Sequence, residues 1–460
     1  MKKINVAIII IFITISIFIG SHHEPWADEA QSWLIARDAN VSDIIWNISR
    51  YEGTFPLWFL ILKAFIISGL QYKYLYIIPI IISSIGLWVF LNKTQVPIYI
   101  KILYPFTFYI FYQYTIIARS YCLLFLAFSL WMVTYKDRFN HSLKYILNLI
   151  FFSFISMHGM LIALGFTAMF LIDIFKRKEL KQNLIYFLLI GLVNFIEIII
   201  LLLPSDLYMY VSVTGSIVNN ILIIIKNIIL IDNIFIAIYN LISLVLLIII
   251  LFSTFKKSKD MFIIVCLLIL FILFIRFAPH HLGILYLSIT FGYLESYESQ
   301  TVKIKKIFAI LLILHLLYTI HSGINDYLKP YSGSKEMSKY IEEMNYEEME
   351  IYAFGYNNVS ILPYFDKNIF SNWENMTYYK WSINNKDWYN YCNFKYIDKS
   401  EFKDFPKYIL IKYDDNMHIL RIIDYIENTK KYEIDYMAKG YQFFKNFYSE
   451  KEDFILYKLK

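Results

Sequence analysis

A series of long apolar runs constrains this chain more than any other feature. A bilayer core of roughly 30 Å needs about 20 apolar residues in a helix, and runs near that length recur as far as residue 324. They lie at about 4–20, 75–91, 98–116, 121–135, 145–157, 160–175, 183–203, 233–255, 261–276, 282–297 and 307–323. We therefore expect a multi-pass α-helical membrane protein with about 11 transmembrane helices, and not a soluble enzyme.

Charge divides the chain into two parts. Residues 1–324 hold 24 Lys/Arg and 15 Asp/Glu, whereas residues 325–460 hold 19 and 22. The overall charge of +6 therefore combines +9 in a membrane part with −3 in a tail, so no uniformly basic surface for nucleic acid is expected. The tail shows helical patterns at 334–349 and 417–431 and strand-like patterns at 349–356, 406–414 and 452–459. We predict a transmembrane domain at 1–324 and a small α/β domain at 325–460.

The basic residues indicate how the chain is threaded. Short cytoplasmic loops collect Lys and Arg, and 17 of the 24 basic residues before position 325 fall in alternate loops. They are Lys2, Lys3, Lys93, Lys101, Lys136, Arg138, Lys144, Lys176, Arg177, Lys178, Lys181, Lys256, Lys257, Lys259, Lys303, Lys305 and Lys306. This pattern predicts a cytoplasmic N-terminus. An odd number of crossings then places the domain 325–460 on the extracytoplasmic face of the cell membrane.

Two apolar runs do not fit that threading as crossings. The run 56–69 is short and contains Lys63, so we expect an amphipathic helix in the membrane interface with Lys63 snorkelling to water. The run 216–231 receives the same interpretation. The first run has no small-x-small cleavage site before Ser21, so it is expected to be a retained helix and not a signal peptide.

Cysteine usage and composition exclude further classes. Three cysteines occur; Cys122 and Cys266 lie in apolar runs and Cys392 is alone in the tail. A disulfide framework and a cysteine-rich zinc site are therefore excluded. Low Gly and Ala with abundant Ile, Lys, Asn and Tyr is typical of proteins from AT-rich bacterial genomes.

The first outer loop, about 21–74, is the most polar part of the membrane half and contains Asp28 and Glu29. One interpretation is structural: Asp28 with Gln31 matches a capping box at a helix start. The other is chemical: adjacent carboxylates at the membrane boundary, near Arg37 or Arg50 in sequence, supply a general base for a hydroxyl. The two are compatible, because a helix start also fixes a carboxylate in place.

Three short motifs in order carry a resemblance. They are Asp28-Glu29 in the first outer loop, Tyr51-Glu52-Gly53-Thr54-Phe55-Pro56-Leu57-Trp58 after it, and Ala118-Arg119-Ser120-Tyr121 opening a later helix. Together they resemble the GT-C integral membrane glycosyltransferases, nearest the branch of protein O-mannosyltransferases and the lipid A aminoarabinose transferase. Relatives often have His-Pro where this chain has Phe55-Pro56, so any role for that histidine is absent.

The resemblance implies transfer of a sugar from a polyprenyl-phosphate donor to an extracytoplasmic hydroxyl of a glycan, lipid or protein. Its implied partners are this lipid-linked donor, membrane lipids and the acceptor. Asp28 is the expected base, with Glu29 as neighbour or alternate. Cations at the outer helix ends are expected to bind the donor phosphate, although snorkelling also explains arginines there. These residues are Arg119, Arg276, His280 and His281; loop and substrate candidates are Arg50, Tyr51, Glu52 and His158.

A divalent metal is a further candidate cofactor, but adjacent His280 and His281 would diverge on a helix and chelate poorly unless Pro279 holds them in a loop. Two rival functions remain. A transporter or flippase of lipid-linked glycans would use ionisable groups near the bilayer midplane, for which Glu197 is the candidate. A non-catalytic membrane anchor that displays the tail would leave the polar first loop without a purpose.

Overall fold

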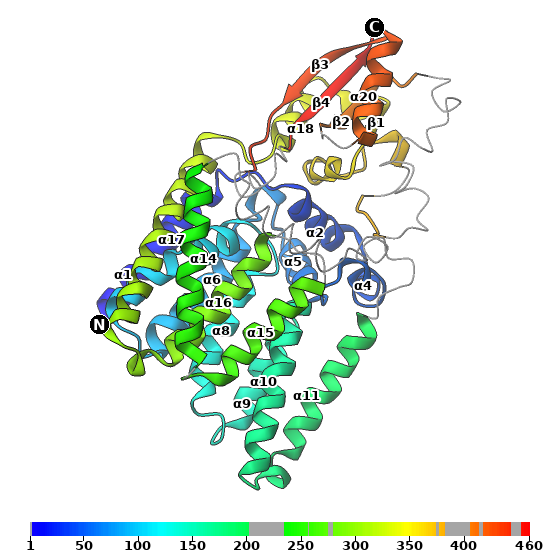
Figure 1. The fold of residues 1–460 in the computed structure, drawn as a ribbon. Coiled ribbons are helices and arrows are strands. Elements are labelled where there is room, and N and C mark those ends of the chain that lie inside the picture. Colours follow the sequence, from blue (N-terminus) through cyan, green and yellow to red (C-terminus); the bar gives the residue numbers. More distant parts are fainter. Residues whose placement is uncertain are drawn as a thin grey trace.

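A computed structural model of the chain describes residues 2–201, 234–255, 257–274, 279–373, 377–381, 405–413, 417–442 and 452–460. Helices form an elongated bundle, and a small sheet lies beyond one end of it, with the C-terminus at the tip of the sheet (Figure 1). The predicted combination of an apolar helical part and a C-terminal α/β part is confirmed. The predicted run 216–231 lies outside the described residues.

Within these ranges, six segments are long and apolar enough to cross a membrane. They fall in α1 (Lys2–Gly20), α6 (Ile77–Lys93), α10 (Met157–Lys176), α11 (Leu180–Ile200), α14 (Ile234–Phe255) and α17 (Val302–Leu328). Apolar side chains point out of the bundle along them, including Ile10, Leu188 and Phe252, each more than half exposed. Exposed apolar stripes of this kind suit hydrocarbon and not water.

The other predicted crossings are helices of 12 to 16 residues. They correspond to α8 (Cys122–Tyr135), α9 (Ser142–Ser153), α15 (Lys259–Phe274) and α16 (Leu282–Glu295). The predicted run 98–116 is not one continuous helix, which corrects the sequence interpretation. It divides into α7 (Ile98–Leu103), the 3₁₀ turn η3 (Tyr104–Phe106) and the π-helical η4 (Tyr109–Ile116). Pro105 cannot donate a backbone hydrogen bond, and Thr107 is extended, so the helix is interrupted there.

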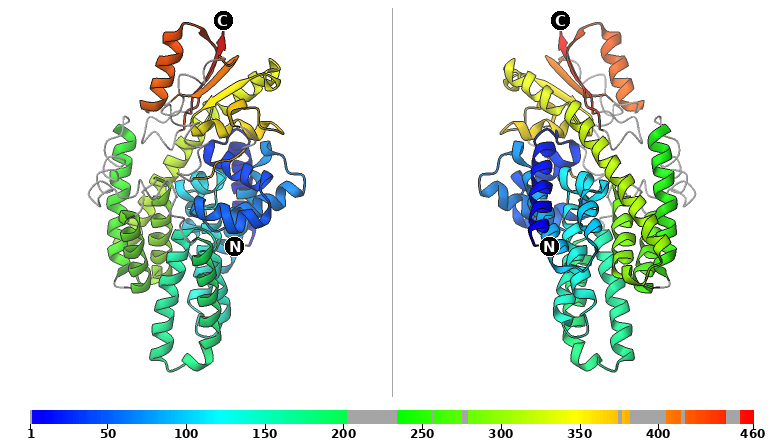
Figure 2. Two further views of the ribbon diagram at one scale, coloured as in Figure 1. Left: turned by 90° about the vertical axis from the view of Figure 1, so that its right-hand side faces the viewer. Right: turned by 90° about the vertical axis from the view of Figure 1, so that its left-hand side faces the viewer.

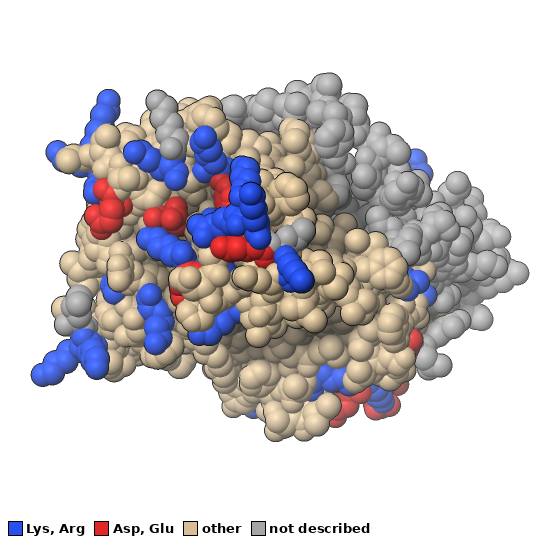
Figure 3. Space-filling model, turned by 90° about the horizontal axis from the view of Figure 1, so that it is seen from below, with Lys and Arg blue, Asp and Glu red and all other residues tan. Residues whose placement is uncertain are grey.

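Contacts between helix ends occur at the end of the bundle that lies away from the sheet. Asn5 Nδ2 donates to Leu91 O at 3.0 Å, and Tyr135 Oη donates to Asp260 Oδ2 at 2.7 Å. Tyr99 of α7 and Tyr297, in the connection between α16 and α17, bond through their hydroxyls, which are 3.1 Å apart. The described members of the basic clusters lie in these helix ends and in the turns between them, and Figure 3 shows Lys and Arg side chains gathered on this end.

The first loop folds at the opposite end of the bundle. It contains α2 (Ala27–Asp38), α3 (Val41–Asp43), the π-turn η1 (Ile44–Ile48), α4 (Ser49–Glu52), α5 (Leu57–Ile67) and η2 (Tyr72–Tyr74). The predicted helix at 56–69 is therefore present as α5. Lys63 does not simply snorkel: its Nζ donates to Ala36 O at 2.9 Å and Ala39 O at 2.7 Å, at the C-terminal end of α2. A cation there complements the helix dipole.

The C-terminal sheet has four strands in the order β1-β2-β4-β3. They are β1 (Ile351–Phe354), β2 (Tyr408–Lys412), β3 (Tyr432–Ala438) and β4 (Phe454–Leu459), with β1 parallel to β2 and the other pairs antiparallel. Helices α18 (Ser334–Glu343) and α20 (Met417–Thr429) accompany the sheet. The remaining elements are 3₁₀ turns: η5 (Pro279–His281), η6 (Tyr297–Ser299), η7 (Tyr346–Glu348), η8 (Tyr356–Ser360), η9 (Leu362–Tyr364) and η10 (Ser371–Trp373).

Alternation along β2 explains how this domain packs. Ile409 and Ile411 face the apolar side of α20, whereas Leu410 belongs to the core that is continuous with the helical bundle. All five residues of β2 are buried, as expected of an inner strand covered on both faces. Helix α17 runs from the bundle directly into this domain (Figure 2). The α/β domain is thus docked onto the first loop, not tethered loosely.

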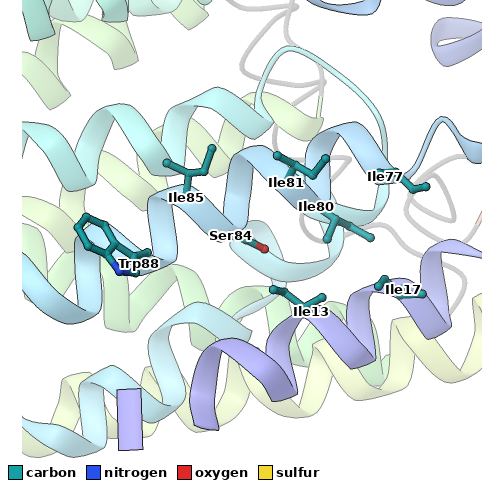
Figure 4. A pocket seen from close by; sticks show the side chains of 8 residues that line it. All are labelled: Ile13, Ile17, Ile77, Ile80, Ile81, Ser84, Ile85 and Trp88. Atoms are coloured by element: carbon teal, nitrogen blue, oxygen red, sulfur yellow. The ribbon is translucent and has the colours of Figure 1, made fainter. Parts of the chain in front are cut away.

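A groove of about 550 Å³ lies on the outer surface between α1 and α6 (Figure 4). Its lining is Ile13, Ile17, Ile77, Ile80, Ile81, Ser84, Ile85 and Trp88. The hydroxyl of Ser84 and the indole N–H of Trp88 are the side-chain polar groups of this lining. The groove therefore suits a hydrocarbon chain and offers no acid, base or cation for chemistry.

Candidate functional site

The polar groups singled out from the sequence meet where the first loop lies under the α/β domain. Helix α2 begins after Pro25 and Trp26, which is extended and forms the N-cap. The carboxylate of Glu29 accepts the Trp26 N–H at 3.2 Å, and Glu452 of the α/β domain accepts the Ala27 N–H at 3.1 Å. The capping prediction for Asp28 is therefore wrong. Asp28 lies inside the helix, and Glu29 and Glu452 accept the hydrogen bonds from the amides at the start of α2.

Asp28 instead pairs with Arg119. Asp28 Oδ2 lies 3.2 Å from Arg119 Nη1, and the same nitrogen lies 3.3 Å from His280 Nδ1. The aromatic rings of Trp26 and Tyr121 flank the guanidinium, with centroids 6.0 and 5.5 Å from its Cζ. The side chains of Asp28 and Arg119 keep 28% and 21% of their surface exposed. An acid, a cation and an imidazole from three distant segments are thus reachable from outside.

Glu52 adds a second carboxylate beside this pair. Gln31 Nε2 donates to Glu52 Oε1 at 2.9 Å, and Trp381 also hydrogen-bonds the carboxylate. Burial raises the pKa of Glu52 to about 7, and the charge of Asp28 adds to the rise, against the opposing effects of Gln31 and Arg119. A buried carboxyl with a raised pKa beside a second carboxylate is a common arrangement in acid–base sites.

Glu29 is placed differently from Asp28. Its side chain is 1% exposed, and its oxygens accept from the Ala118 N–H at 2.6 Å as well as from Trp26, while His23 Nε2 lies 3.1 Å away. These bonds hold the start of α2 against the turn that carries Arg119. The structure therefore assigns Glu29 to support of the site, and its expected role as an alternate base is not favoured.

His23, Asp326 and Tyr112 complete this support, and sequence reasoning missed all three. His23 Nδ1 lies 2.9 Å from Asp326 Oδ2, and Tyr112 Oη donates to the same oxygen at 3.2 Å. Burial lowers the pKa of His23, but the charges of Asp326 and Glu29 outweigh burial and raise it to about 10. His23 is therefore a buried cation between two carboxylates. The available signal was an ionisable residue at the outer end of each of two apolar runs.

Three histidines lie on the other side of Arg119. The rings of His280 and His281 are 4.4 Å apart, and the His158 ring is 4.3 Å from that of His281. Pro279–His281 forms the 3₁₀ turn η5 and not part of an α-helix, which matches the alternative in which Pro279 holds the two histidines in a loop. Burial lowers the pKa of His281 well below its usual value, with His158 and Arg119 adding to the effect, so this imidazole is neutral. Arg276 lies outside the described residues.

The Tyr51–Trp58 motif shapes the loop around Glu52. Gly53 adopts a left-handed conformation with φ of 62°, which ends α4. Thr54 Oγ1 then donates to Ile155 O at 3.3 Å, next to the start of α10. Tyr51 is buried beneath the Lys380 ammonium, 4.5 Å from its ring centroid, and Arg50 is half-buried in the same short helix.

The α/β domain contributes side chains that sequence reasoning did not assign. The amide of Gln31 binds the Tyr379 backbone in both directions, at 2.8 Å to its carbonyl and 3.0 Å from its N–H. The Tyr356 ring lies 4.7 Å from that of Trp381, and burial raises the pKa of the Tyr356 phenol, with the charges of Asp28 and Glu52 adding to the rise. The domain therefore forms an aromatic wall, made of Tyr356, Tyr379 and Trp381, beside the carboxylates.

Among the described residues, no group of three or more His, Cys, Asp or Glu side chains is arranged to hold a metal ion. The cations and carboxylates present instead suit recognition of an anion next to a proton acceptor. In comparisons with protein-family models, with curated proteins and with solved structures, none matches this chain.

Proposed function

We propose that this protein is a membrane glycosyltransferase that moves a sugar from a polyprenyl-phosphate donor to an extracytoplasmic hydroxyl. The single observation that carries the proposal is the Asp28–Arg119–His280 arrangement, in which one guanidinium nitrogen lies 3.2 Å from a carboxylate oxygen and 3.3 Å from an imidazole nitrogen. An acceptor needs a base, and a phosphate leaving group needs a cation. Both are within reach of one another here, at the end of an apolar bundle.

In the proposed step, the acceptor oxygen forms a bond to the anomeric carbon, and the bond from that carbon to the phosphate oxygen breaks with inversion. Asp28 or Glu52 takes the acceptor proton, and the electron pair of the broken bond leaves with the polyprenyl phosphate. Arg119 stabilises the charge that develops on this phosphate. The pKa of about 7 raised by burial makes Glu52 a suitable partner for proton transfer at neutral pH.

The proposed topology follows from charge. The basic connections gathered in Figure 3 would lie in the cytoplasm, with the candidate site and the α/β domain outside. Under this proposal the chain crosses the membrane eleven times, with its shorter helices reaching the surfaces through their flanks. The Glu52 and Arg119 regions would then meet donors presented at the outer leaflet.

The proposal is tested by comparing cells with and without this protein. Mass spectrometry of lipid-linked sugars and surface glycans should show loss of one sugar from the glycans and accumulation of its lipid-linked donor. Purified wild-type protein in vesicles should restore the transfer, and the Asp28→Asn variant should not. An unchanged glycan profile, with no donor accumulating, would rule the transferase out.

A transporter of lipid-linked glycans is the second candidate, favoured by polar groups within the helices. His315, at the middle of α17, is 1% exposed and bonds Ser243 of α14 at 2.9 Å, and Glu197 of α11 is equally buried. Buried ionisable groups within membrane helices often mark transport pathways. A transporter would leave lipid-linked precursor accumulated on the inner leaflet in cells that lack the protein, whereas a transferase would leave it on the outer leaflet.

A further inference from the structure

The segment that carries Arg119 is held by two carboxylates. At its beginning, Tyr112 Oη donates to Asp326 Oδ2 at 3.2 Å; near its end, the Ala118 N–H donates to Glu29 Oε1 at 2.6 Å. Tyr112 lies within the π-helical η4, an uncommon geometry that often occurs at functional sites, and Ala118 follows two residues after its end. Only the Ala118–Arg119 peptide separates the second hydrogen bond from the residue that faces Asp28.

One side chain connects the two carboxylates. His23 places Nδ1 2.9 Å from Asp326 and Nε2 3.1 Å from Glu29, and the three side chains are 2%, 0% and 1% exposed. We call this group the His23 bridge: His23, Glu29 and Asp326. It joins the end of α1, the start of α2 and the end of α17, which leads into the α/β domain. Tyr331 lies against the imidazole, with ring centroids 4.7 Å apart.

Removing the bridging cation would leave two carboxylates close together in a buried place. Like charges there repel, and an uncompensated buried charge is strongly unfavourable. Glu29 would then move or take up a proton, and its bond to the Ala118 N–H would weaken. The bridge therefore acts on the position of Arg119 through the Glu29–Ala118 hydrogen bond, although none of its members contacts Arg119.

We propose that His23 is a positioning residue that, by holding Glu29 and Asp326 together, fixes the turn at Ala118 and so sets Arg119 beside Asp28. This inference rests on the proposed function for its consequence, which is binding of the donor phosphate. The ordering of the turn at Ala118 does not depend on whether a donor binds. The two parts are measured separately.

The ordering is tested by hydrogen exchange on the purified full-length protein. His23→Gln should speed exchange of the Ala118 amide by at least about tenfold, the range expected for weakening a charge-assisted hydrogen bond. His22→Gln is the matched control, because His22 is adjacent but exposed and bonds Phe18 O. Asp326→Asn, which keeps the shape of the side chain, supplies a second variant should His23→Gln fold poorly. Unchanged exchange at Ala118 in a folded variant that lacks the bridge would overturn the proposal.

The consequence is tested with a polyprenyl monophosphate as the probe. His23→Gln should weaken its binding by at least about tenfold, while binding of the polyprenol of the same chain length, which lacks the phosphate, stays unchanged. Equal loss for both lipids would show a merely structural role and would contradict positioning of Arg119. Failure of the wild-type protein to bind the phosphate probe at all would remove the proposed donor, and the exchange measurement would still decide the bridge.

Discussion

Arg119 Nη1 lies 3.2 Å from Asp28 Oδ2, although 91 positions separate the two residues. Both side chains are partly exposed, and ion pairs of that kind add little to stability, about 0–1 kcal/mol. The pair therefore is not explained as a stabilising contact. Its place between the aromatic wall of the α/β domain and the three histidines favours a role in binding and chemistry.

Asp28→Asn should abolish most sugar transfer while the protein stays folded. Asn keeps the shape of the side chain but cannot accept the acceptor proton, and general-base catalysis contributes roughly 10²–10⁴-fold. The measurement is transfer in reconstituted vesicles, together with the melting temperature. Asp38→Asn is the matched control, since Asp38 lies on the same helix and pairs with Arg37. Wild-type transfer by Asp28→Asn would remove Asp28 from the proposed mechanism.

The sequence predicted several residues of the site but neither their contacts nor how each is used. Asp28 was named because the first outer loop is polar and carries adjacent carboxylates, and Arg119 and His280 because cations at the outer ends of apolar runs are unusual. Glu29 could not be separated from Asp28, because neighbours on a helix point in directions about 100° apart and only the fold shows which one is buried. Asp326 was missed because the division of the chain at residue 324 assigned it to the C-terminal domain.

Glu52 should give transfer a pH dependence near neutrality. Burial raises the pKa of Glu52 to about 7, so the carboxylate is protonated below that pH and ionised above it. If Glu52 accepts a proton, the rate rises with pH through about 7, and Glu52→Gln removes this rise. The measurement is the initial rate of transfer from pH 5.5 to 8.5 for the wild type and for Glu52→Gln. The same pH profile in both would contradict a role for Glu52 in proton transfer.

Glu52 should also make the stability of the protein fall as the pH rises, whereas the transfer rate rises. The pKa of Glu52 is higher in the folded protein than its usual 4.5, so the folded state binds more protons between these values. Stability from this group is then greatest below pH 4.5 and falls as the pH rises to about 7. Burial also raises the pKa of Glu24 to about 7, so the comparison must be wild type against Glu52→Gln. The variant should gain relative stability across that interval, as measured by thermal unfolding in detergent.

His23→Gln should destabilise the protein most at low and neutral pH. The charges of Asp326 and Glu29 outweigh burial and raise the pKa of His23 to about 10 from 6.5, so its stabilising effect is complete below pH 6.5 and is lost as the pH approaches 10. Removing one partner of a buried ion pair typically costs about 3–5 kcal/mol. The free energy of unfolding of His23→Gln should therefore lie well below that of the control His22→Gln at pH 6, and the difference should be smaller at pH 9.5.

Two tyrosines and two carboxylates face His23 from other elements. Tyr112 and Tyr331 are buried beside it, and burial raises the pKa of Tyr331 well above its ordinary value, so the phenol stays neutral over the range tested. Glu29 and Asp326 are the charged neighbours. A stability difference that does not depend on pH would contradict the ionised bridge.

The fold was predictable where a single physical rule decides it. Runs of apolar residues predicted the helices, and short strand-like runs predicted β1, β2 and β4. Strand β3 was missed because it lies at the edge of the sheet and carries Glu433 and Asp435 with an irregular burial pattern. The break at Pro105 was missed because apolar composition hides the loss of one backbone donor.

Glu452→Leu should loosen the α/β domain from α2. Glu452 is fully buried and accepts from the Ala27 N–H at 3.1 Å and from Asn357 Nδ2 at 2.7 Å. Leucine leaves both donors unpaired, at about 1–3 kcal/mol for each buried group. Faster hydrogen exchange at the start of α2 is the expected result, and Glu452→Gln, which retains an acceptor oxygen, should be milder. Glu433→Leu on the exposed edge strand is the control; equal effects of both leucine variants would refute the docking contact.

Lys63→Met distinguishes a helix cap from a snorkelling side chain. The ammonium donates to Ala36 O and Ala39 O at the end of α2, where the helix dipole favours a cation. Methionine keeps an apolar stem, so a snorkelling lysine would be replaced at no cost, whereas loss of the cap should destabilise the protein by about 1–2 kcal/mol. Lys73→Met is the matched control, because Lys73 is exposed and lies over the ring of its neighbour Tyr74. Since α2 also carries Asp28, the capped end and the candidate site share one rigid element, and Lys63→Met should lower transfer as well as the melting temperature. Equal melting temperatures for Lys63→Met and Lys73→Met would show that Lys63 does not cap the helix.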